Sequence, residues 1–264
     1  MSELRDSSPT TPVRGTGEPS HVDRLRSEFT RAAATFGQRT KGRFDGYGIV
    51  EFARVAPHES VLEVGAGTGN FLSLFYGAAG TLIAADITLA MLTSGCAAHP
   101  YINAVAADGA RLPLRSRTID VAASAQMFHH VPEPVPVLRE MARVMSDRGR
   151  MLIVDQVATD KFEEAVAMNE LEIIRDPSHA ASRPRSAFHV MLRAACLTVS
   201  DERVEAGRQR FSDWMWPGEF PQERIDDVLD FIERRGLETG MDFERDGDDW
   251  VFTRRRIMLL AERA

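Results

Sequence analysis

The sequence has few cysteines and no long apolar run. Its 264 residues include two cysteines, Cys96 and Cys196, which lie far apart and match no metal-ligand spacing. We expect two free thiols in a reducing compartment and no metal site. No apolar stretch approaches the roughly 18–20 residues that a membrane-spanning helix needs. These absences predict a cytoplasmic protein without a membrane span.

An excess of basic residues is also missing, because the formal net charge is −7. A protein that binds duplex nucleic acid usually carries a basic surface that neutralises phosphates. We therefore predict a small-molecule substrate and no nucleic-acid partner. The oligomeric state stays open, and a homo-oligomer is compatible with the sequence.

Residues 1–20 are rich in Ser, Thr, Pro and Gly and lack the apolar core of a signal peptide. We predict that they form a disordered tail, followed by a single domain over 21–264. A helical flap is expected over 21–57, where apolar residues at helical spacing predict a helix over 22–36 that ends at Gly37.

From residue 60 onward, short apolar runs alternate with helical stretches. Strands are predicted at 60–64, 81–85, 101–106, 118–125 and 151–154. Such alternation is typical of a doubly wound parallel sheet with right-handed crossovers. A helical lid insert over 160–195 and two late strands, at 197–204 and 250–260, complete the pattern. The expected fold is α/β, with a Rossmann-like sheet of about seven strands whose last strand is antiparallel.

The strongest motif lies where the first strand turns toward a helix and reads Glu63-Val64-Gly65-Ala66-Gly67-Thr68-Gly69-Asn70. Glycines at such a turn let the backbone bend tightly and approach a ligand, and helix N-terminal amides favour negative groups. Asn70 replaces the third glycine of a dinucleotide fingerprint, and no Gly-Lys-Ser/Thr of a P-loop follows.

An acidic residue, Asp86, ends the second strand about twenty residues further on. A carboxylate there can accept hydrogen bonds from both ribose hydroxyls of a nucleoside. Ile87 and Met91, which follow it, are expected to pack against an adenine ring.

The glycine motif resembles the first motif of the class I methyltransferases that use S-adenosylmethionine (SAM). Three later stretches are similar to further motifs of that family: 107–114 around Asp108 and Gly109, 119–130 with Ala125 and Gln126, and 139–150, which departs from the family pattern at 146–149. The resemblance covers about 45–155 and implies SAM as cofactor. The cofactor-binding residues it implies are Glu63, Gly65, Ala66, Gly67, Asn70, Asp86, Ile87, Met91, Asp108, Gly109, Ala125 and Gln126.

The substrate side is expected to involve the lid insert and the aromatic stretches. The lid resembles that of a subgroup near the ubiquinone/menaquinone biosynthesis methyltransferases and natural-product enzymes. Glu170 and His130 are the candidate proton acceptors. The candidate substrate contacts are Phe36, Tyr47, His129, Arg175, His179, Arg193 and Trp214. Other aromatic residues, among them Phe29, Phe44, Phe211, Trp216 and Phe220, are expected to form core or an apolar wall.

The sequence therefore predicts a SAM-dependent methyltransferase that acts on a small, apolar or aromatic, anionic metabolite in biosynthesis. Methylation of O, N or C stays open. One alternative is C-methylation of an isoprenoid diphosphate with Glu170 as base, for which Mg²⁺ could hold the diphosphate. An alternative of another class is a SAM-binding cyclase or a SAM-binding protein without catalysis.

Overall fold

The computed structural model describes residues 19–215 and 220–264. The α-helices are α1 (His21–Thr40), α2 (Ile49–Ala53), α3 (Leu89–Ala98), α4 (Pro134–Val144), α5 (Phe162–Arg175), α6 (Arg185–Ala194), α7 (Phe211–Trp214) and α8 (Gln222–Arg235). Short 3-10 helices are η1 (Leu72–Phe75), η2 (Phe128–His130) and η3 (Gly236–Thr239). The strands are β1 (Ser60–Val64), β2 (Thr81–Asp86), β3 (Asn103–Ala106), β4 (Ile119–Ala125), β5 (Met145–Ala158), β6 (Arg183–Pro184), β7 (Leu197–Arg210), β8 (Glu244–Asp246) and β9 (Asp249–Arg263).

The main path of the sheet runs β3-β2-β1-β4-β5-β9-β7, while β6 pairs with β5 and β8 pairs with β9. The strands from β3 to β5 are parallel, and β9 is antiparallel to both β5 and β7. One core cluster packs α4 and α6 on the sheet, and a second packs α2, η1 and α3 on it. The predicted Rossmann-like α/β fold with an antiparallel last strand is confirmed.

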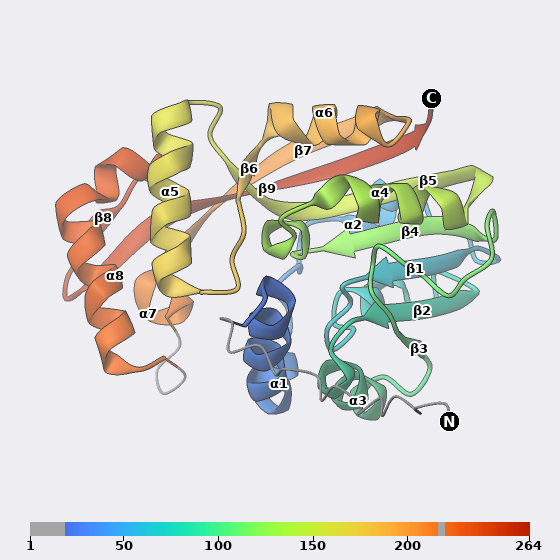
Figure 1. Ribbon diagram of the computed structural model, residues 1–264, viewed down its shortest axis with the longest axis horizontal. Coiled ribbons are helices and arrows are strands. Elements are labelled where there is room, and N and C mark those ends of the chain that lie inside the picture. Colours follow the sequence, from blue (N-terminus) through green and yellow to red (C-terminus); the bar gives the residue numbers. More distant parts are fainter. Residues whose placement is uncertain (1–18, 216–219) are drawn as a thin grey trace, which may run out of the picture.

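Strands β7 and β9 are longer than the sequence predicts and extend past the end of the parallel sheet (Figure 1). There they meet α5, α7 and α8 around a third apolar cluster that contains Trp214, Phe231 and Phe252. Helix α8 is accompanied there by α7, η3 and β8 (Figure 1). This group of helices forms a wall beside the carboxyl ends of the parallel strands.

Helix α1 begins with a capping box, in which Ser20 and Asp23 satisfy each other's backbone N–H groups. The prediction that this helix ends at Gly37 is wrong, because the helix continues to Thr40. Glycine inside a helix costs about 1 kcal/mol relative to alanine. The Asn70 amide offsets this cost, because it donates to the Gly37 carbonyl at 2.7 Å and to Thr40 Oγ1 at 2.8 Å.

The predicted lid over 160–195 divides between two places. Helix α6 packs against α4 and β7 on one face of the sheet, whereas α5 packs against α8 and η3 (Figure 1). Only the end of α5 and the segment after it border the cavity described below. Of the predicted tail 1–20, only Pro19 and Ser20 lie within the described residues. None of the described helices is long and apolar enough to span a membrane.

Candidate active site

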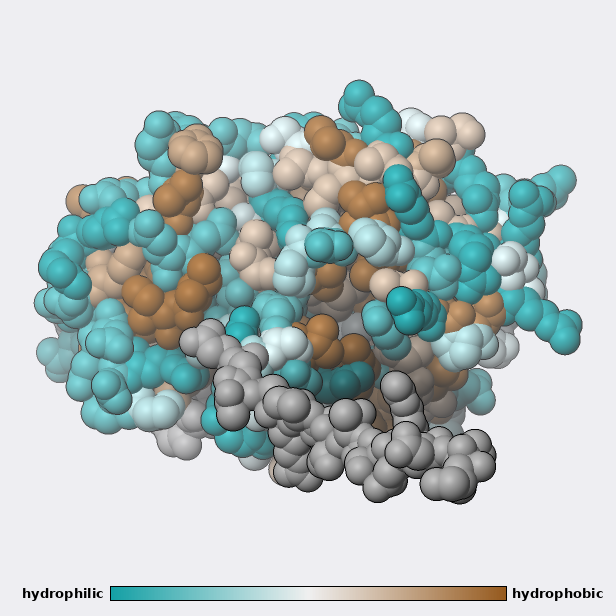
Figure 2. Space-filling model, viewed as in Figure 1, coloured by the Kyte–Doolittle hydropathy of each residue, from teal (hydrophilic) through white to brown (hydrophobic). Residues whose placement is uncertain are grey.

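A cavity of about 560 Å³ lies at the carboxyl ends of the parallel strands, beside α1. This is the edge at which open α/β sheets bind ligands, and the volume is typical of a small-molecule site. Hydrophilic residues cover most of the face seen in Figure 2, and hydrophobic residues gather in separate patches on it. The cavity is lined by all the residues predicted to bind the cofactor: Glu63, Gly65, Ala66, Gly67, Asn70, Asp86, Ile87, Met91, Asp108, Gly109, Ala125 and Gln126.

The glycine-rich loop after β1 passes through the left-handed region, with φ of +72° at Gly65 and +54° at Gly67. A Cβ on Gly65 would lie 2.2 Å from Met127 Cγ, and one on Gly67 would lie 3.1 Å from Met91 Cε. Both positions therefore require glycine, for backbone conformation and for space. The loop is held to β2 by the Gly65 N–H, which donates to the Ala85 carbonyl at 2.8 Å.

Two carboxyl groups flank this loop. Asp86 accepts from the Gly67 N–H at 2.8 Å and from the Thr88 N–H at 2.7 Å, so it fixes the loop to the start of α3. Burial raises the pKa of Asp86, although these N–H donors oppose the shift. Burial also raises the pKa of Glu63 well above its usual range, and Glu63 Oε2 has no hydrogen bond to the described residues. A cationic or hydrogen-donating ligand would satisfy this oxygen.

Gln126 follows β4 and has φ of +53°, an uncommon conformation for a residue other than glycine. Its N–H donates to the Val154 carbonyl at 2.8 Å, which holds the conformation in place. Its buried Nε2 lines the cavity and has no hydrogen-bond partner among the described residues. An outlier of this kind at a cavity is typical of a binding site.

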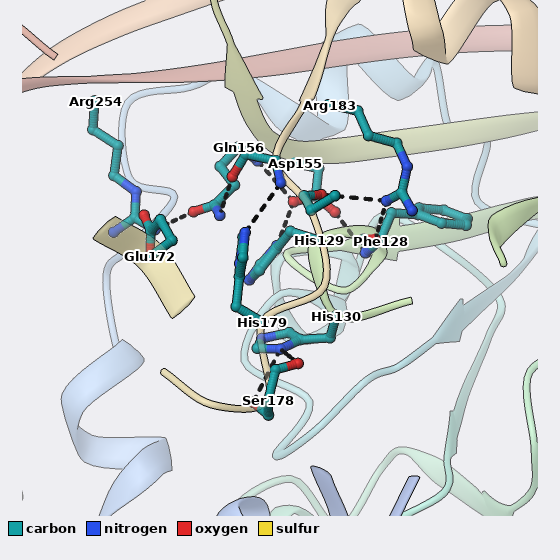
Figure 3. A network of polar contacts seen from close by, with 12 residues as sticks. Phe128, His129, His130, Asp155, Gln156, Glu172, Ser178, His179, Arg183 and Arg254 are labelled. Carbon is teal, nitrogen blue, oxygen red and sulfur yellow. Dashed lines mark hydrogen bonds and ion pairs between the residues drawn. The ribbon is translucent and has the colours of Figure 1, made fainter. Parts of the chain in front are cut away.

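A buried polar network lies behind this loop (Figure 3). His129 Nδ1 is 2.6 Å from Asp155 Oδ1, and Asp155 also accepts from the backbone N–H of Phe128 at 2.7 Å. Burial lowers the pKa of His129 well below its usual value and raises the pKa of Asp155 to about 6. His129 is therefore a neutral donor that orients η2. Arg183 fixes the other side of η2, because it donates to the carbonyls of Phe128 and Val131, each at 2.7 Å.

His130 lies next to this network and lines the cavity (Figure 3). Its Nδ1 is 3.0 Å from the carbonyl oxygen of Ser178. A carbonyl oxygen only accepts, so Nδ1 carries the hydrogen, and neutral His130 has its lone pair on Nε2. Nε2 makes no hydrogen bond to the described residues. The side chain is also held by Phe29 of α1, whose ring meets it edge-on at 5.2 Å between centroids.

Comparisons with known proteins address the kind of site this is. A family model described as a methyltransferase domain matches residues 62–153. The uncharacterized methyltransferase YcgJ of Bacillus subtilis is 25% identical over 186 residues, which are 69% of this chain and 74% of that protein. The crystal structure of YcgJ superposes with a TM-score of 0.76 at 21% identity, covering 81% of this chain and 96% of that one, which shows the shared fold.

Demethylmenaquinone methyltransferases are also similar to this chain. That of Mycolicibacterium vanbaalenii is 29% identical over 190 residues, 72% of this chain and 81% of the enzyme. That of Streptomyces griseus is 30% identical over 99 residues, 38% of this chain and 43% of the enzyme, so this alignment spans less than half of that relative. A methyltransferase domain is thus matched over residues 62–153, and together with these similar proteins it supports a class I SAM-dependent methyltransferase.

The residues of this methyltransferase fit SAM. The glycine loop leaves backbone space for a ligand, Glu63 Oε2 and Gln126 Nε2 are buried without partners, and Asp86 faces the same cavity. Glu63 would hold the ammonium of SAM, Gln126 would contact the region of the methyl-bearing sulfur, and Asp86 would hold the ribose. The Asn70 side chain has a different task, because its hydrogen bonds go to α1 and to His99 Nε2 at 3.1 Å.

Four of the predicted substrate contacts lie in this site. Phe36, His129, Arg175 and Trp214 line the cavity. The Arg175 guanidinium stacks over the ring of Trp214 at 4.8 Å. His179 is buried one layer further out, 2.9 Å from Asn169 Oδ1, where it holds the segment after α5 rather than the cavity wall. Phe29, Phe44 and Phe220 line the cavity as well, Phe211 lies in the third apolar cluster, and Trp216 is outside the described residues.

Besides His179, three predicted residues are not at the cavity. Glu170 lies on the exposed side of α5 and pairs with Arg235 at 2.5 Å, so the structure gives no support to its role as a base. Arg193 is exposed on α6, which packs on the sheet away from the site. Tyr47 packs against the second core cluster and reaches the cavity only through Arg256, which donates to its hydroxyl at 2.6 Å.

The sequence reasoning missed six arginines that line the cavity, namely Arg31, Arg39, Arg43, Arg224, Arg254 and Arg256. A signal for two of them was present, because residues two apart on a strand share a face. Strand β9 carries Arg254 and Arg256 in this spacing. No comparable pattern marks Arg39 and Arg43, whose place depends on the extension of α1 to Thr40.

Proposed function

We propose that this methyltransferase transfers the methyl group of SAM to a small metabolite with an apolar or aromatic body and an anionic group. The observation that supports it is the continuity of one cavity, which is lined by the glycine loop and also by apolar side chains from α1, from α7 and from the residues on either side of η2. Bound SAM supplies an electrophilic methyl group on a positively charged sulfur. The protein's contribution is then to position the acceptor and exclude water.

We propose that His130 accepts the proton when the nucleophile must lose one. Its neutral tautomer has the lone pair on Nε2, and general-base catalysis of this kind typically contributes 10²–10⁴-fold. The other candidate at the wall, Asp176, is a poorer base. Burial raises the pKa of Asp176, but the positive charge that His130 carries when protonated, the charge of Arg175 and hydrogen bonds from Ser178 lower it by more. Its net pKa is below the usual range.

The alternative of C-methylation of an isoprenoid diphosphate requires Glu170 to act as a base inside the cavity. With Glu170 paired to Arg235 on the surface, a carbocation formed in the cavity would not meet this carboxylate. O- or N-methylation with His130 as proton acceptor therefore fits the described residues better than C-methylation with Glu170 as base. A cyclase or a non-transferring SAM-binding protein would retain the SAM half of the cavity and give no methylated product.

The test is incubation of the full chain with methyl-labelled SAM and a panel of phenols, amines, carboxylic acids and phosphorylated apolar compounds. Mass spectrometry then detects a product heavier by the labelled methyl group. We expect His130→Gln to lower the rate about 10²–10⁴-fold and to change its pH profile. Glu170→Gln, the matched control in the same region, should keep the wild-type rate. Equal losses in both variants, or SAM binding without any labelled product, would contradict the proposal.

A further inference from the structure

Five arginines from distant parts of the chain line one side of the cavity. We call them the arginine cluster: Arg39, Arg43, Arg175, Arg254 and Arg256. They come from α1 and the residues after it, from the end of α5, and from β9. Arg255, between the two β9 members, points to the opposite side and donates to Asp242 at 2.8 Å.

The members of the arginine cluster are close enough to affect one another's charge. Burial lowers the pKa of Arg43 to about 9, and repulsion from each of the other four arginines contributes to this shift. Burial lowers the pKa of Arg254 to about 10, and Arg175 and Arg256 add to the effect, whereas Glu172 opposes it. The carboxylates of Glu172 and Asp176 offset part of this repulsion, and an anion bound beside Arg175, Arg254 and Arg256 would offset more of it.

Three buried N–H donors of the arginine cluster also lack an acceptor among the described residues. The Nε atoms of Arg175, Arg254 and Arg256 are buried and donate to none of the described residues. The carboxylate of Glu172 lies 3.6 Å from Arg175 Nε and 3.8 Å from Arg254 Nη2, and both distances are too long for a hydrogen bond. Figure 3 shows Glu172 beside Arg254. Buried donors without acceptors are uncommon in proteins and are typical of ligand sites.

Apolar rings lie directly beside the arginine cluster. The guanidinium groups of Arg39 and Arg43 lie 5.8 Å and 6.0 Å from the ring centre of Phe36. Arg175 stacks on Trp214, which is almost fully buried. A ligand anchored here by an anionic group would therefore place an adjoining apolar body against these rings.

We propose that the arginine cluster binds a phosphoryl group of the methyl acceptor, so that the substrate is an apolar compound with a phosphate or diphosphate group. This inference rests on the proposed function and names its substrate class. Arginine forks match phosphate geometry, and a phosphoryl group offers at least three acceptor oxygens to the three leftover Nε–H donors. The methionine carboxylate of SAM has two oxygens and would satisfy at most part of the arginine cluster.

The experiment is calorimetric titration of the full chain, saturated with S-adenosylhomocysteine, with pyrophosphate, inorganic phosphate or acetate at constant ionic strength. We expect pyrophosphate and phosphate to bind, and acetate to bind at least tenfold more weakly. Arg254→Gln and Arg256→Gln should each weaken pyrophosphate binding by about ten- to a hundredfold, the usual effect of losing a charged hydrogen bond. Arg255→Gln, a neighbour on the other face of β9, should bind like the wild type.

Thermal melting of each variant establishes whether it is folded. Arg254→Gln also loses contacts to Gln156 and Glu172, so if this variant does not fold, the test relies on Arg256→Gln. The proposal is overturned if neither phosphate nor pyrophosphate binds, or if Arg255→Gln weakens them as much as the cavity variants do. It is equally overturned if pyrophosphate displaces S-adenosylhomocysteine and the variants lose affinity for both, since the arginines would then hold the methionine carboxylate. Intact pyrophosphate binding without methyl transfer to any compound would instead contradict the proposed function alone.

Discussion

The close contact between the glycine loop and η2 makes a quantitative prediction for Gly65→Ala. A Cβ at this position would lie 2.2 Å from Met127 Cγ and 2.8 Å from Met127 Cβ. The second atom is next to the backbone, so rotation of the Met127 side chain does not remove the whole overlap. The φ of +72° adds about 1–2 kcal/mol for a residue other than glycine, and overpacking typically costs about 1–3 kcal/mol more. We expect a total loss of about 2–5 kcal/mol in the free energy of unfolding.

Gly77→Ala separates the two costs, because Gly77 also has positive φ, +80°, but apart from its chain neighbours no described residue lies within 4 Å of its added Cβ. Urea unfolding should therefore show a loss of only about 1–2 kcal/mol for this control. Met127→Ala removes the Cγ and should recover at least about 1 kcal/mol in the double variant with Gly65→Ala. If Gly65→Ala costs no more than Gly77→Ala, or if the double variant is additive within about 0.5 kcal/mol, the packing argument is wrong.

Two further predictions concern the residues around the cavity. Asn70→Ala removes the hydrogen bonds to Gly37 and Thr40, so amide hydrogen exchange over 37–40 should accelerate and the free energy of unfolding should fall by about 1–3 kcal/mol. Unchanged exchange would show that Asn70 does not hold α1 to the glycine loop. Burial lowers the pKa of His179 to about 4, so the folded state resists a proton that the unfolded chain takes up below about pH 6.5. Stability should be lost as pH falls through this range, by about 2 kcal/mol at pH 5 from this group. In thermal melts His179→Gln should lose less stability than the wild type between pH 7 and 5, and an identical loss in both proteins would contradict this assignment.

The cofactor half of the site was predictable because its geometry is local. A strand, a glycine turn and an acidic residue at the end of the next strand place Gly67 and Asp86 together through one 2.8 Å hydrogen bond. Parallel pairing of β1 with β2 then fixes both residues at the same edge of the sheet. This explains why the motif residues line one cavity even though the sequence alone gives no coordinates.

The substrate side of the cavity was predicted less well, because it depends on which side of α5 is buried and on how β7 and β9 pair at the far end of the chain. Buried positions on α5 include Met168, Leu171 and Glu172, and Glu170 lies on the opposite side. The apolar residues at 171, 173 and 174 conceal which side of the helix is buried, since Ile173 is 49% exposed. The sequence alone therefore does not show that Glu170 lies on the exposed side of α5 while Glu172 is buried.

The two halves of the cavity also depend on different chemistry. The SAM side uses backbone N–H groups and glycines within the span that matches the methyltransferase family model, residues 62–153. The opposite side uses side chains outside that span, such as Arg43, Trp214 and Arg254. A side chain on this opposite side of the cavity can be substituted without moving the strands that carry the glycine loop. The specificity of this enzyme for its methyl acceptor should therefore reside in α1, α5, α7 and β9, which lie outside the span that the family model matches.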